Sequence, residues 1–406
     1  MKALGIIAEY NPFHKGHYYH LLESKKASGA DACVAVMSGN FTQRGDAALL
    51  SKWERSKIAV DCGIDLVLEL PFVYACNNAE IFAKGAVQIL NGLNFIDTVS
   101  FGSESGELTK LAETAEIISN ETPAFKKSIR EHLDKGFSYP KARALAVRDA
   151  AGEEAANILN SPNNILAVEY IKQLCLSGSK MIPLTIKRKG QDYNSTIPDG
   201  EFSSAAAIRN CLNETGSIDN IKEYVPIECL ENIKNLNINI NKIINNMFLL
   251  ISSRIITEKP EDLEKIFSAG EGLGSKLKKA MRDSSDLDEL LMAIKSKRYT
   301  MTRIKRLLVH TLFNLSAIDF NDIESRNLNY ARVLAFNDKG AALLKKAKAA
   351  GPLIPVITNI KKQVKETDDI MKILKYDIAA SDVYNLISGR DISSESDFVT
   401  APYHKF

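Results

Sequence analysis

A chain of 406 residues is longer than one ordinary core requires, so we expect two or three domains. Apolar residues make up 45% of the sequence and charged residues 25%, which excludes a wholly disordered or fibrous protein. The formal net charge of +2 is too small to identify a polyanionic partner, but it is unevenly spread: residues 1–219 carry −3 and residues 220–406 carry +5. The basic excess therefore lies in the second half.

We expect no targeting segment at the start of the chain. Its first apolar run, KALGIIA, ends at a polar Glu-Tyr-Asn-Pro stretch and is shorter than the core of a signal peptide. No window approaches the ~20 apolar residues of a membrane span. The six cysteines form no C-x-x-C pair, which is typical of reduced thiols. We therefore expect a cytoplasmic protein that has no membrane partner.

Short apolar runs rich in β-branched residues alternate with amphipathic stretches in the first half. The predicted strands are KALGIIA (2–8), ACVAVM (32–37), DLVLEL (65–70), TVSFG (98–102) and MIPLTI (181–186). The predicted helices are 17–29, 51–62, 78–93, 107–119, 122–136, 139–150 and 164–177. Strands that alternate with helices imply right-handed crossovers, so the predicted fold class is α/β, with a Rossmann-like doubly wound parallel sheet.

The strand signal stops after about residue 212, and long helical patterns follow. They are NMFLLISSRII (246–256), LDELLMAIKSKRYTMTRIKRLLVHTLF (287–313) and RVLAFNDKGAALLKKAKAAG (332–351), and a small strand pair is expected near PLIPVIT (352–358). We place a boundary near 215–225. The predicted organisation is an α/β domain over residues 1–218, followed by a mainly helical, basic domain over residues 219–406.

Three of the six histidines, His14, His17 and His20, fall within seven positions directly after the first predicted strand. In doubly wound folds, ligands bind at the carboxyl ends of the strands, where the strand order reverses. A helix that begins near His17 offers free backbone N–H groups and the positive end of its dipole, and both attract phosphate. We therefore expect a phosphate-bearing ligand at this place.

The spacing of these histidines is that of an H-x-G-H motif. Asn11-Pro12 turns the chain, and Gly16 lacks a side chain, so that a ligand can approach the backbone. Two imidazoles one helical turn apart can both donate hydrogen bonds to the charge that develops when a nucleotide α-phosphate is attacked, so we predict that His14 and His17 are catalytic. Three other interpretations stay open: zinc binding by the three histidines, a general-base histidine, and histidines packed or solvated without a function.

These residues carry a resemblance. His14-x-Gly16-His17 and the later segment SAAAIR (204–209) resemble the HxGH and SSxxIR motifs of the nucleotidyltransferase superfamily. Further segments narrow the resemblance from the superfamily to one family. They are AEYNPFHKGH (8–17), AVMSGNFTQRGD (35–46), SKWERSKIAVDCGIDLVLELP (51–71), FGSESG (101–106), SPNNILAVEY (161–170) and KRYTMTRIKRLL (297–308). Together they are similar to the bacterial tRNA(Met) cytidine acetate ligase family over most of the chain.

The resemblance implies an ATP-dependent ligase whose nucleotidyltransferase-like domain activates acetate as acetyl-adenylate and releases pyrophosphate. The acetyl group then passes to N4 of the wobble cytidine of elongator tRNA(Met). The implied ATP-binding residues are Ile7, Ala8, Glu9, Tyr10, Asn11, Pro12, Phe13, His14, Lys15, Gly16, His17, His20, Gly102, Asn163 and Arg188. Mg²⁺ is expected with the ATP phosphates, and no metal ligand from the protein is predicted. An ordinary turn glycine and a plain helix cap stay open for Gly102 and Asn163.

Several cations are candidates for anion binding. Arg188 and Arg209 suit phosphate, because a guanidinium is always charged and binds two oxygens at once. A second polar cluster follows the ACVAVM strand; its members are Gln43, Arg44, Lys52 and Arg55. We predict that Arg44, Lys52 and Arg209 contact phosphate or acetate. The alternative for these cations is a solvated surface.

The segment KSKRYTMTRIKR (295–306) contains no acidic residue. On a helix, positions 298, 302, 305 and 306 share roughly one face, where cations follow a phosphate backbone, and Tyr299 offers a ring for an unpaired base. The predicted tRNA-binding residues are Lys297, Arg298, Tyr299, Arg303, Lys305 and Arg306. The alternative is a solvated basic helix.

Two other functions compete with the acetate ligase. One is a nucleotidyltransferase-type enzyme that acts on a small-molecule acceptor. The other is a non-catalytic RNA-binding protein whose α/β half only retains a nucleotide pocket. Formation of acetyl-adenylate and of an acetylated tRNA nucleoside separates the three.

Overall fold

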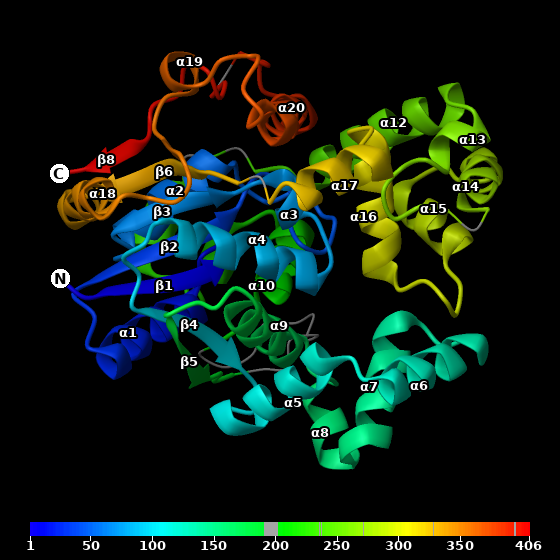
Figure 1. Cartoon of the computed structure of the whole chain (residues 1–406). Coiled ribbons are helices and arrows are strands. Elements are labelled where there is room, and N and C mark those ends of the chain that lie inside the picture. The colour runs from blue at the N-terminus through cyan, green and yellow to red at the C-terminus, as the bar shows by residue number, and fades with distance from the viewer. Residues whose placement is uncertain (191–201, 235, 237, 271, 328, 394) are drawn as a thin grey trace.

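The computed structural model describes residues 1–190, 202–234, 236, 238–270, 272–327, 329–393 and 395–406. Within them, eight strands form one sheet in the order β5-β4-β1-β2-β3-β6-β7, and β8 also pairs with β6 (Figure 1). The strands are β1 (Ala3–Ala8), β2 (Ala32–Ser38), β3 (Leu66–Leu70), β4 (Thr98–Ser103), β5 (Ile182–Lys187), β6 (Ala331–Asn337), β7 (Val356–Ile357) and β8 (Tyr403–Lys405). All five strands predicted in the first half are present.

The strand order reverses beside β1. From β1 the chain adds β2 and then β3 on one side, and it then returns to place β4 on the other side of β1. These pairings and the β4–β5 pairing are all parallel, as predicted. The carboxyl ends of β1 and β4 therefore lie next to each other at the switch point, where doubly wound folds bind ligands.

The helices before residue 235 are α1 (Lys15–Ser28), α2 (Lys52–Asp61), α3 (Phe72–Ala75), α4 (Ala79–Gly92), α5 (Leu108–Asn120), α6 (Pro123–Asp134), α7 (Tyr139–Ala151), α8 (Glu153–Ile158), α9 (Pro162–Leu176), α10 (Ala205–Thr215), the 3-10 helix η1 (Ile218–Ile221) and α11 (Ile227–Ile233). The later helices are α12 (Ile240–Thr257), α13 (Pro260–Leu263), α14 (Leu273–Arg282), α15 (Leu287–Ile294), α16 (Met301–Leu312), α17 (Ala317–Ser325), α18 (Asp338–Ala350), α19 (Ile360–Gln363) and α20 (Met371–Ser388). Each helix predicted in the first half is present.

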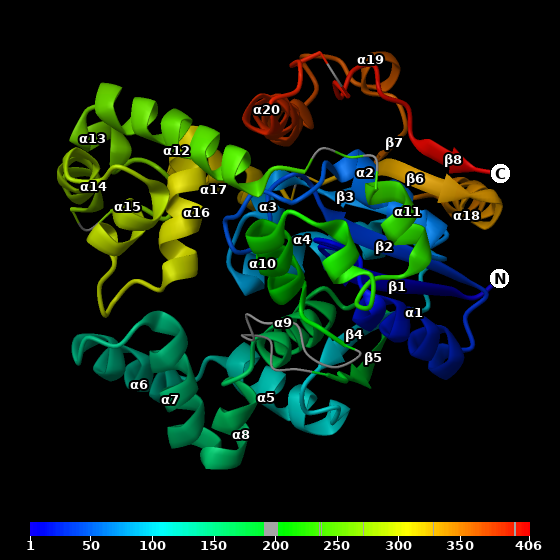
Figure 2. The ribbon, with the colours of Figure 1, turned by 180° about the vertical axis from the view of Figure 1, so that it is seen from behind.

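Different helices bury the two faces of the sheet. Successive residues of β2 alternate between two apolar clusters, because side chains along a strand point to opposite faces. Val34 packs in the cluster that includes α4 and α9, and Ala35 packs in the cluster that includes α2 and α10. Figure 2, the view from behind, shows α10 and α11 in front of the sheet, whereas Figure 1 shows α4 in front of α10. The sheet is therefore a central layer between two helical layers.

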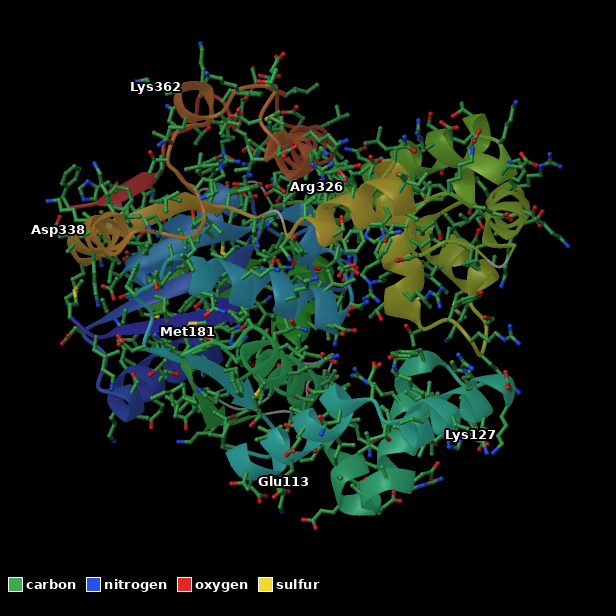
Figure 3. The ribbon with its side chains drawn as sticks, in the orientation of Figure 1. Glu113, Lys127, Met181, Arg326, Asp338 and Lys362 are labelled. Carbon is green, nitrogen blue, oxygen red and sulfur yellow. The ribbon has the colours of Figure 1, made fainter. Side chains whose placement is uncertain are left out.

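Two helical groups extend away from the sheet. The helices α12 to α17 lie together beside it, and α5 to α8 form a second group that both views place below them (Figures 1 and 2). In Figure 3, Lys127 of α6 and Glu113 of α5 lie at the outer surface of this second group. None of the helices in the described part of the chain is long and apolar enough to cross a membrane.

The prediction of one helical pattern over residues 332–351 is wrong in its first part. Residues Ala331–Asn337 form β6, which pairs antiparallel with β3, and α18 begins only at Asp338. Asn337 caps that helix by accepting a hydrogen bond from the Gly340 N–H. A short apolar run that is buried on both sides looks alike in a strand and in a helix. Of the strand pair expected near 352–358, the segment supplies one strand, β7, and its partner is β6.

Three strands from the second half thus complete the sheet of the first half, since β6, β7 and β8 all come after residue 330. The division into domains 1–218 and 219–406 stays a prediction. The structure adds that the later segment contributes a helical group and one edge of the shared sheet (Figure 1).

The helical pattern predicted over residues 287–313 is interrupted. Helix α15 ends at Ile294, and α16 begins at Met301 after Thr300, whose side chain accepts a hydrogen bond from the Arg303 N–H. The residues between them are polar or charged and offer no apolar side chain at helical spacing to bury, apart from Tyr299. Arg298 therefore precedes the helix, and the expected basic face through positions 298, 302, 305 and 306 does not form.

Candidate active site

A cavity opens at the switch point between β1 and β4. Its walls come from the turn after β1, the start of α1, the ends of β4 and β5, residues 42–46, α9 and the start of α10. The predicted site residues that line it are Ile7, Ala8, Glu9, Tyr10, Asn11, His14, Gly16, His17, His20, Arg44, Gly102, Asn163, Arg188 and Arg209. Those that do not line it are Pro12, Phe13, Lys15 and Lys52. Phe13 packs its ring against Tyr10 instead.

His14 and His17 form the cap of α1. The Nδ1 atom of His14 accepts a hydrogen bond from the Gly16 N–H at 3.0 Å, and Nδ1 of His17 accepts one from the His14 N–H at 3.3 Å. The two rings stack with their centroids 3.7 Å apart. A Cβ on Gly16 would lie 2.8 Å from Cε1 of His14, so the glycine makes room for the capping ring. The H-x-G-H spacing is therefore a structural requirement of the cap.

This capping fixes the protonation of both rings. Burial lowers the pKa of His14 to about 3, and burial together with His14 lowers the pKa of His17 well below its ordinary value. Both rings are therefore neutral at pH 7. Because Nδ1 accepts in each ring, the remaining proton lies on Nε2. The pair thus offers two N–H donors to the cavity without carrying charge.

His20 lies one turn further along α1, against β4. Its Nε2 atom is 3.2 Å from the hydroxyl of Ser100, and burial lowers its pKa to about 4. A zinc site at His14, His17 and His20 does not fit, because Nδ1 of His14 and of His17 and Nε2 of His20 are already engaged. In the described part of the chain, no group of three or more His, Cys, Asp or Glu side chains could hold a metal ion.

Three arginines line the same cavity. Nη1 of Arg209 donates to the Asn11 carbonyl at 2.6 Å, which ties α10 to the turn after β1. The backbone N–H of Arg188 donates to the Ser103 carbonyl at 2.9 Å. A Cβ on Gly102 would lie 3.2 Å from Cγ of Arg188, so the glycine makes room for that arginine side chain. Arg44 lies in the wall formed by residues 42–46. The cavity is therefore suited to a polyanion.

The start of α10 adds a second helix N-terminus to the wall. Ser204 caps this helix, because its hydroxyl accepts a hydrogen bond from the Ala207 N–H at 3.0 Å. The hydroxyl of Ser203 is buried, lines the cavity and has no hydrogen-bond partner among the described residues. Such an orphaned donor at a helix N-terminus fits the oxygens of a phosphate.

Asn163 lies in the first turn of α9 and is bound to the loop after β4. Its Nδ2 donates to Oε1 of Glu104 at 2.7 Å, and the same carboxylate accepts the Asn164 N–H at 2.9 Å. In return, Oδ1 of Asn164 accepts the Glu104 N–H at 2.9 Å. Ser161, and not Asn163, occupies the cap position of this helix. A plain capping role for Asn163 is therefore wrong.

The expectation that Lys52 contacts phosphate or acetate is not supported, because its side chain is completely buried outside the cavity. Its Nζ atom lies 2.7 Å from Glu69 and 2.9 Å from Asp397, and Arg332 contacts the same two carboxylates. Arg55 is buried as well and donates to the backbone carbonyls of Leu50, Glu9 and Gly39. A charged helix start looks the same in sequence whether it faces a ligand or a buried carboxylate.

The predicted tRNA-binding residues divide into three pairs with different surroundings. Lys297 and Arg298 are exposed in the segment between α15 and α16. Tyr299 is only 8% exposed, and the Arg303 guanidinium lies 4.6 Å from the centre of its ring, so the ring does not offer a free stacking face. Lys305 and Arg306 bond to residues 42–46 of the cavity wall. These two side chains therefore do not lie on an open surface for RNA.

Sequence reasoning missed part of the wall. Lys187 at the end of β5 and Lys189 after it line the cavity, together with Thr42 and Asp46 from the segment after β2. Both segments follow the carboxyl ends of parallel strands, which is the signal that identifies them. The apolar part of the wall includes Phe82 from α4, which no motif indicates.

The chain matches the model of the HIGH Nucleotidyl Transferase family over residues 1–397. It is 41% identical over 406 residues to a tRNA(Met) cytidine acetate ligase of Thermoanaerobacter sp. (strain X514), with 98% of each chain covered. It is 38% identical to one of Clostridium novyi, with 100% of each chain covered.

Solved structures agree with these relatives. The crystal structure of Thermotoga maritima TmcAL bound with alpha-thio ATP has a TM-score of 0.91 to this chain at 32% identity. The apo form of the same protein has a TM-score of 0.92. Each comparison covers 100% of this chain and 99% of the other. Because the paired histidines, the switch-point cavity and the full-length matches coincide, the chain belongs to the HIGH nucleotidyl transferase family and, within it, to the tRNA(Met) cytidine acetate ligases.

Proposed function

We propose that this protein is an ATP-dependent ligase that forms acetyl-adenylate and then acetylates N4 of the wobble cytidine of elongator tRNA(Met). The observation that carries the proposal is the pair of neutral, stacked imidazoles that share one cavity with Arg44, Arg188 and Arg209. Bound ATP needs cations that neutralise the charge of its triphosphate. The transition state also needs preorganised N–H donors at the phosphoryl oxygens, where further negative charge develops. This cavity offers both.

In the first step, an acetate oxygen attacks the α-phosphorus of ATP, the bond to the bridging oxygen breaks, and pyrophosphate leaves. The Nε2–H groups of His14 and His17 donate to the phosphoryl oxygens as negative charge builds up there. The N-termini of α1 and α10 and the three arginines hold the triphosphate. No covalent bond to the protein is required.

Mg²⁺, when it accompanies ATP, supplies neutralisation of the phosphate oxygens. Among the described residues, the carboxylates that line the cavity are those of Glu9 and Asp46. Oε1 of Glu9 already accepts the Gln43 N–H at 2.7 Å, and Asp46 pairs with Lys305 at 2.7 Å. The residues therefore fit a magnesium ion held mainly by phosphate oxygens and water.

In the second step, N4 of the cytidine attacks the acetyl carbonyl, AMP leaves, and the amine loses a proton. The tRNA reaches the cavity while its phosphates contact basic side chains outside it. Lys297 and Arg298 are exposed for this role. Phosphate contacts of this kind supply affinity without reading the sequence, so the choice of one tRNA depends on its shape or its unstacked bases.

The first test is acetate-dependent exchange of labelled pyrophosphate into ATP without RNA. We expect exchange with the wild-type protein and a loss of about 10²-fold or more for His17→Ala, because removal of one preorganised donor typically costs that much. His404→Ala is the matched control, since His404 lies outside the cavity on β8 and should leave exchange unchanged. Absence of exchange with acetate and with every other carboxylic acid would remove the proposal.

The second test is mass analysis of elongator tRNA(Met) after incubation with ATP and acetate. We expect one added acetyl group on the wobble cytidine. Exchange without this product indicates a nucleotidyltransferase with a small-molecule acceptor. Binding of ATP and tRNA with neither product indicates a non-catalytic RNA-binding protein.

A further inference from the structure

Residues 42–46, here called the wall loop, form a tight turn between the bridged residues Phe41 and Ala47. The Gly45 N–H donates to the Thr42 carbonyl at 3.0 Å, and the Thr42 N–H donates to the Asp46 carbonyl at 2.9 Å. On its inner side the loop meets the cavity, and the Gln43 N–H donates to Oε1 of Glu9 at 2.7 Å. The loop carries Arg44, one of the three arginines of the cavity, between Gln43 and Gly45.

On its outer side the same loop rests on α16. Nζ of Lys305 is 2.7 Å from Oδ1 of Asp46, and Nη1 of Arg306 donates to the Gln43 carbonyl at 3.2 Å. Gly45 packs against the helix backbone, since a Cβ there would lie 2.5 Å from the Arg306 nitrogen. Its φ of +83° lies in the left-handed region that only glycine adopts without strain. The loop therefore has a fixed seat on this helix.

We propose that Lys305 and Arg306, which the sequence assigns to RNA phosphates, are positioning residues of the adenylating site: they seat the wall loop so that Arg44 and Gln43 face the triphosphate. This inference rests on the function proposed above and adds a role for two cations outside the cavity. In this arrangement the helical group formed by α12 to α17 supports the nucleotide site of the sheet. Helix α16 belongs to that group, and the wall loop follows strand β2 of the sheet.

The three contacts between α16 and the wall loop are not expected to contribute equally to the position of the loop. The side chains of Lys305 and Asp46 are about one-third exposed, and an ion pair exposed to water to this extent contributes little to stability. Arg306 is half-buried like Lys305, and burial lowers its pKa to about 10. Its guanidinium bonds directly to the backbone of the wall loop at the Gln43 carbonyl. The backbone contact at Gly45 leaves no space for even one methyl group. We therefore expect the largest effect from Gly45, followed by Arg306 and then Lys305.

Gly45→Ala is the main test. The added methyl group forces the loop away from α16, and a displacement of about 1 Å at a reacting centre can cost about 10²-fold. We expect RNA-free pyrophosphate exchange to fall at least tenfold, while the Kd for tRNA stays within twofold of wild type. Gly136→Ala is the matched control, because its φ of +85° imposes the same backbone strain but a Cβ there meets nothing within 4 Å.

Lys305→Ala and Lys305→Arg test the ion pair itself. We expect Lys305→Ala to lower exchange threefold to tenfold, Lys305→Arg to restore most of it, and neither to change the Kd for tRNA more than twofold. A Lys305→Ala variant with normal exchange and a tenfold weaker Kd for tRNA overturns the inference in favour of RNA binding. Normal exchange by Gly45→Ala overturns it as well.

The thermal midpoint of each variant is measured alongside, so that a loss of exchange by an unfolded protein is recognised. Arg306→Lys serves as the second variant if Gly45→Ala does not fold; it keeps the charge but replaces the guanidinium that reaches the Gln43 carbonyl. It should lower exchange and leave the Kd for tRNA unchanged. Failure of the wild-type protein to exchange contradicts the proposed function, whereas wild-type exchange with unaffected variants contradicts only the positioning role.

Discussion

The imidazole of His14 links the proposed catalytic role to the stability of α1, because one buried ring caps the helix and also lines the cavity. Its pKa of about 3 lies below the value of about 6.5 that the unfolded chain restores. Unfolding therefore takes up a proton below pH about 6.5, and the free energy of unfolding falls as the pH is lowered from there toward 3.

At pH 5 this single group should cost about 2 kcal/mol relative to pH 7, since each pH unit below the unfolded pKa contributes about 1.4 kcal/mol. We expect His14→Asn, which keeps an acceptor for the Gly16 N–H, to lose less stability between pH 7 and pH 5 than wild type. Thermal unfolding of both proteins at pH 7, 6 and 5 measures the difference. Parallel losses in the two proteins would mean that His14 is protonated in the folded state.

Ser203 and Ser204 are adjacent but have different tasks. The Ser203 hydroxyl has no partner among the described residues and lines the cavity, whereas the Ser204 hydroxyl caps α10. We expect Ser203→Ala to leave the thermal midpoint unchanged and to raise the KM for ATP severalfold. Ser204→Ala should lower stability by about 1 kcal/mol, the usual value of a helix cap. Calorimetry and exchange kinetics separate the two, and equal midpoints with equal KM values would refute the distinction.

Single residues were predictable where one motif permits one geometry. The sequence predicts His14 and His17 from the H-x-G-H motif at the end of a strand, and the structure places both beside the cavity. The sequence assigns Gly16 to the approach of a ligand, whereas the structure shows that this glycine makes room for the His14 ring. The prediction for Lys52 is wrong because its partners lie 17 positions away, at Glu69, and 345 positions away, at Asp397, and no helical or strand periodicity indicates that they meet. The periodicity of apolar residues does not predict ion pairs between residues that are distant in the sequence.

At the scale of elements, local signals located the helices and strands of the first half well. Ser51 and Glu54 form a capping box at the start of α2, and Thr122 precedes Pro123 at the start of α6, so helix starts are visible in the sequence. Strand β6 was missed because its apolar run continues directly into α18. Its strand state depends on pairing with β3, which is about 260 positions earlier.

The start of α2 also joins distant elements through the buried charges of Lys52, Glu69, Arg332 and Asp397. Lys52→Met would leave two buried carboxylates with one guanidinium, and a broken buried ion pair costs about 3–5 kcal/mol. We expect a lower thermal midpoint and an unchanged KM for acetate. Lys57→Met is the control, because this lysine is exposed on the same helix. If Lys52→Met instead raised the KM for acetate and left the thermal midpoint unchanged, Lys52 would be a residue of the acetate site.

At the scale of the whole molecule, the sheet cannot be completed by the first half alone. Strand β6 from the second half pairs with β3, and Asp397 near the end of the chain pairs with Lys52 of α2 and with Arg332 of β6. The sequence indicates a change of composition near residue 219, but not this return of the chain to the sheet. Charge excess and helical periodicity describe short segments of the sequence. They do not predict which distant strands pair in the sheet, because that depends on the topology of the whole chain.

The placement of basic residues on the whole molecule gives the last prediction. Lys297 and Arg298 are exposed beside the start of α16, the helix that seats the wall loop of the cavity. Each phosphate contact that is lost lowers the slope of log Kd against log salt by about 0.7–0.9, so the double variant Lys297→Glu, Arg298→Glu should lower it by about 1.5 and weaken tRNA binding at least tenfold. Exchange without RNA should persist.

Lys361→Glu with Lys362→Glu is the matched control for this double variant. These two lysines are exposed on α19, which lies at the far edge of the molecule from the two helical groups, where Figure 3 labels Lys362. Both double variants change the net charge by the same amount, so a general loss of attraction for a polyanion affects them equally. Only a phosphate contact at residues 297 and 298 predicts that the first variant loses salt dependence and the second retains it. If both slopes change by the same amount, the net charge of the whole protein attracts tRNA, and residues 297 and 298 make no specific phosphate contact.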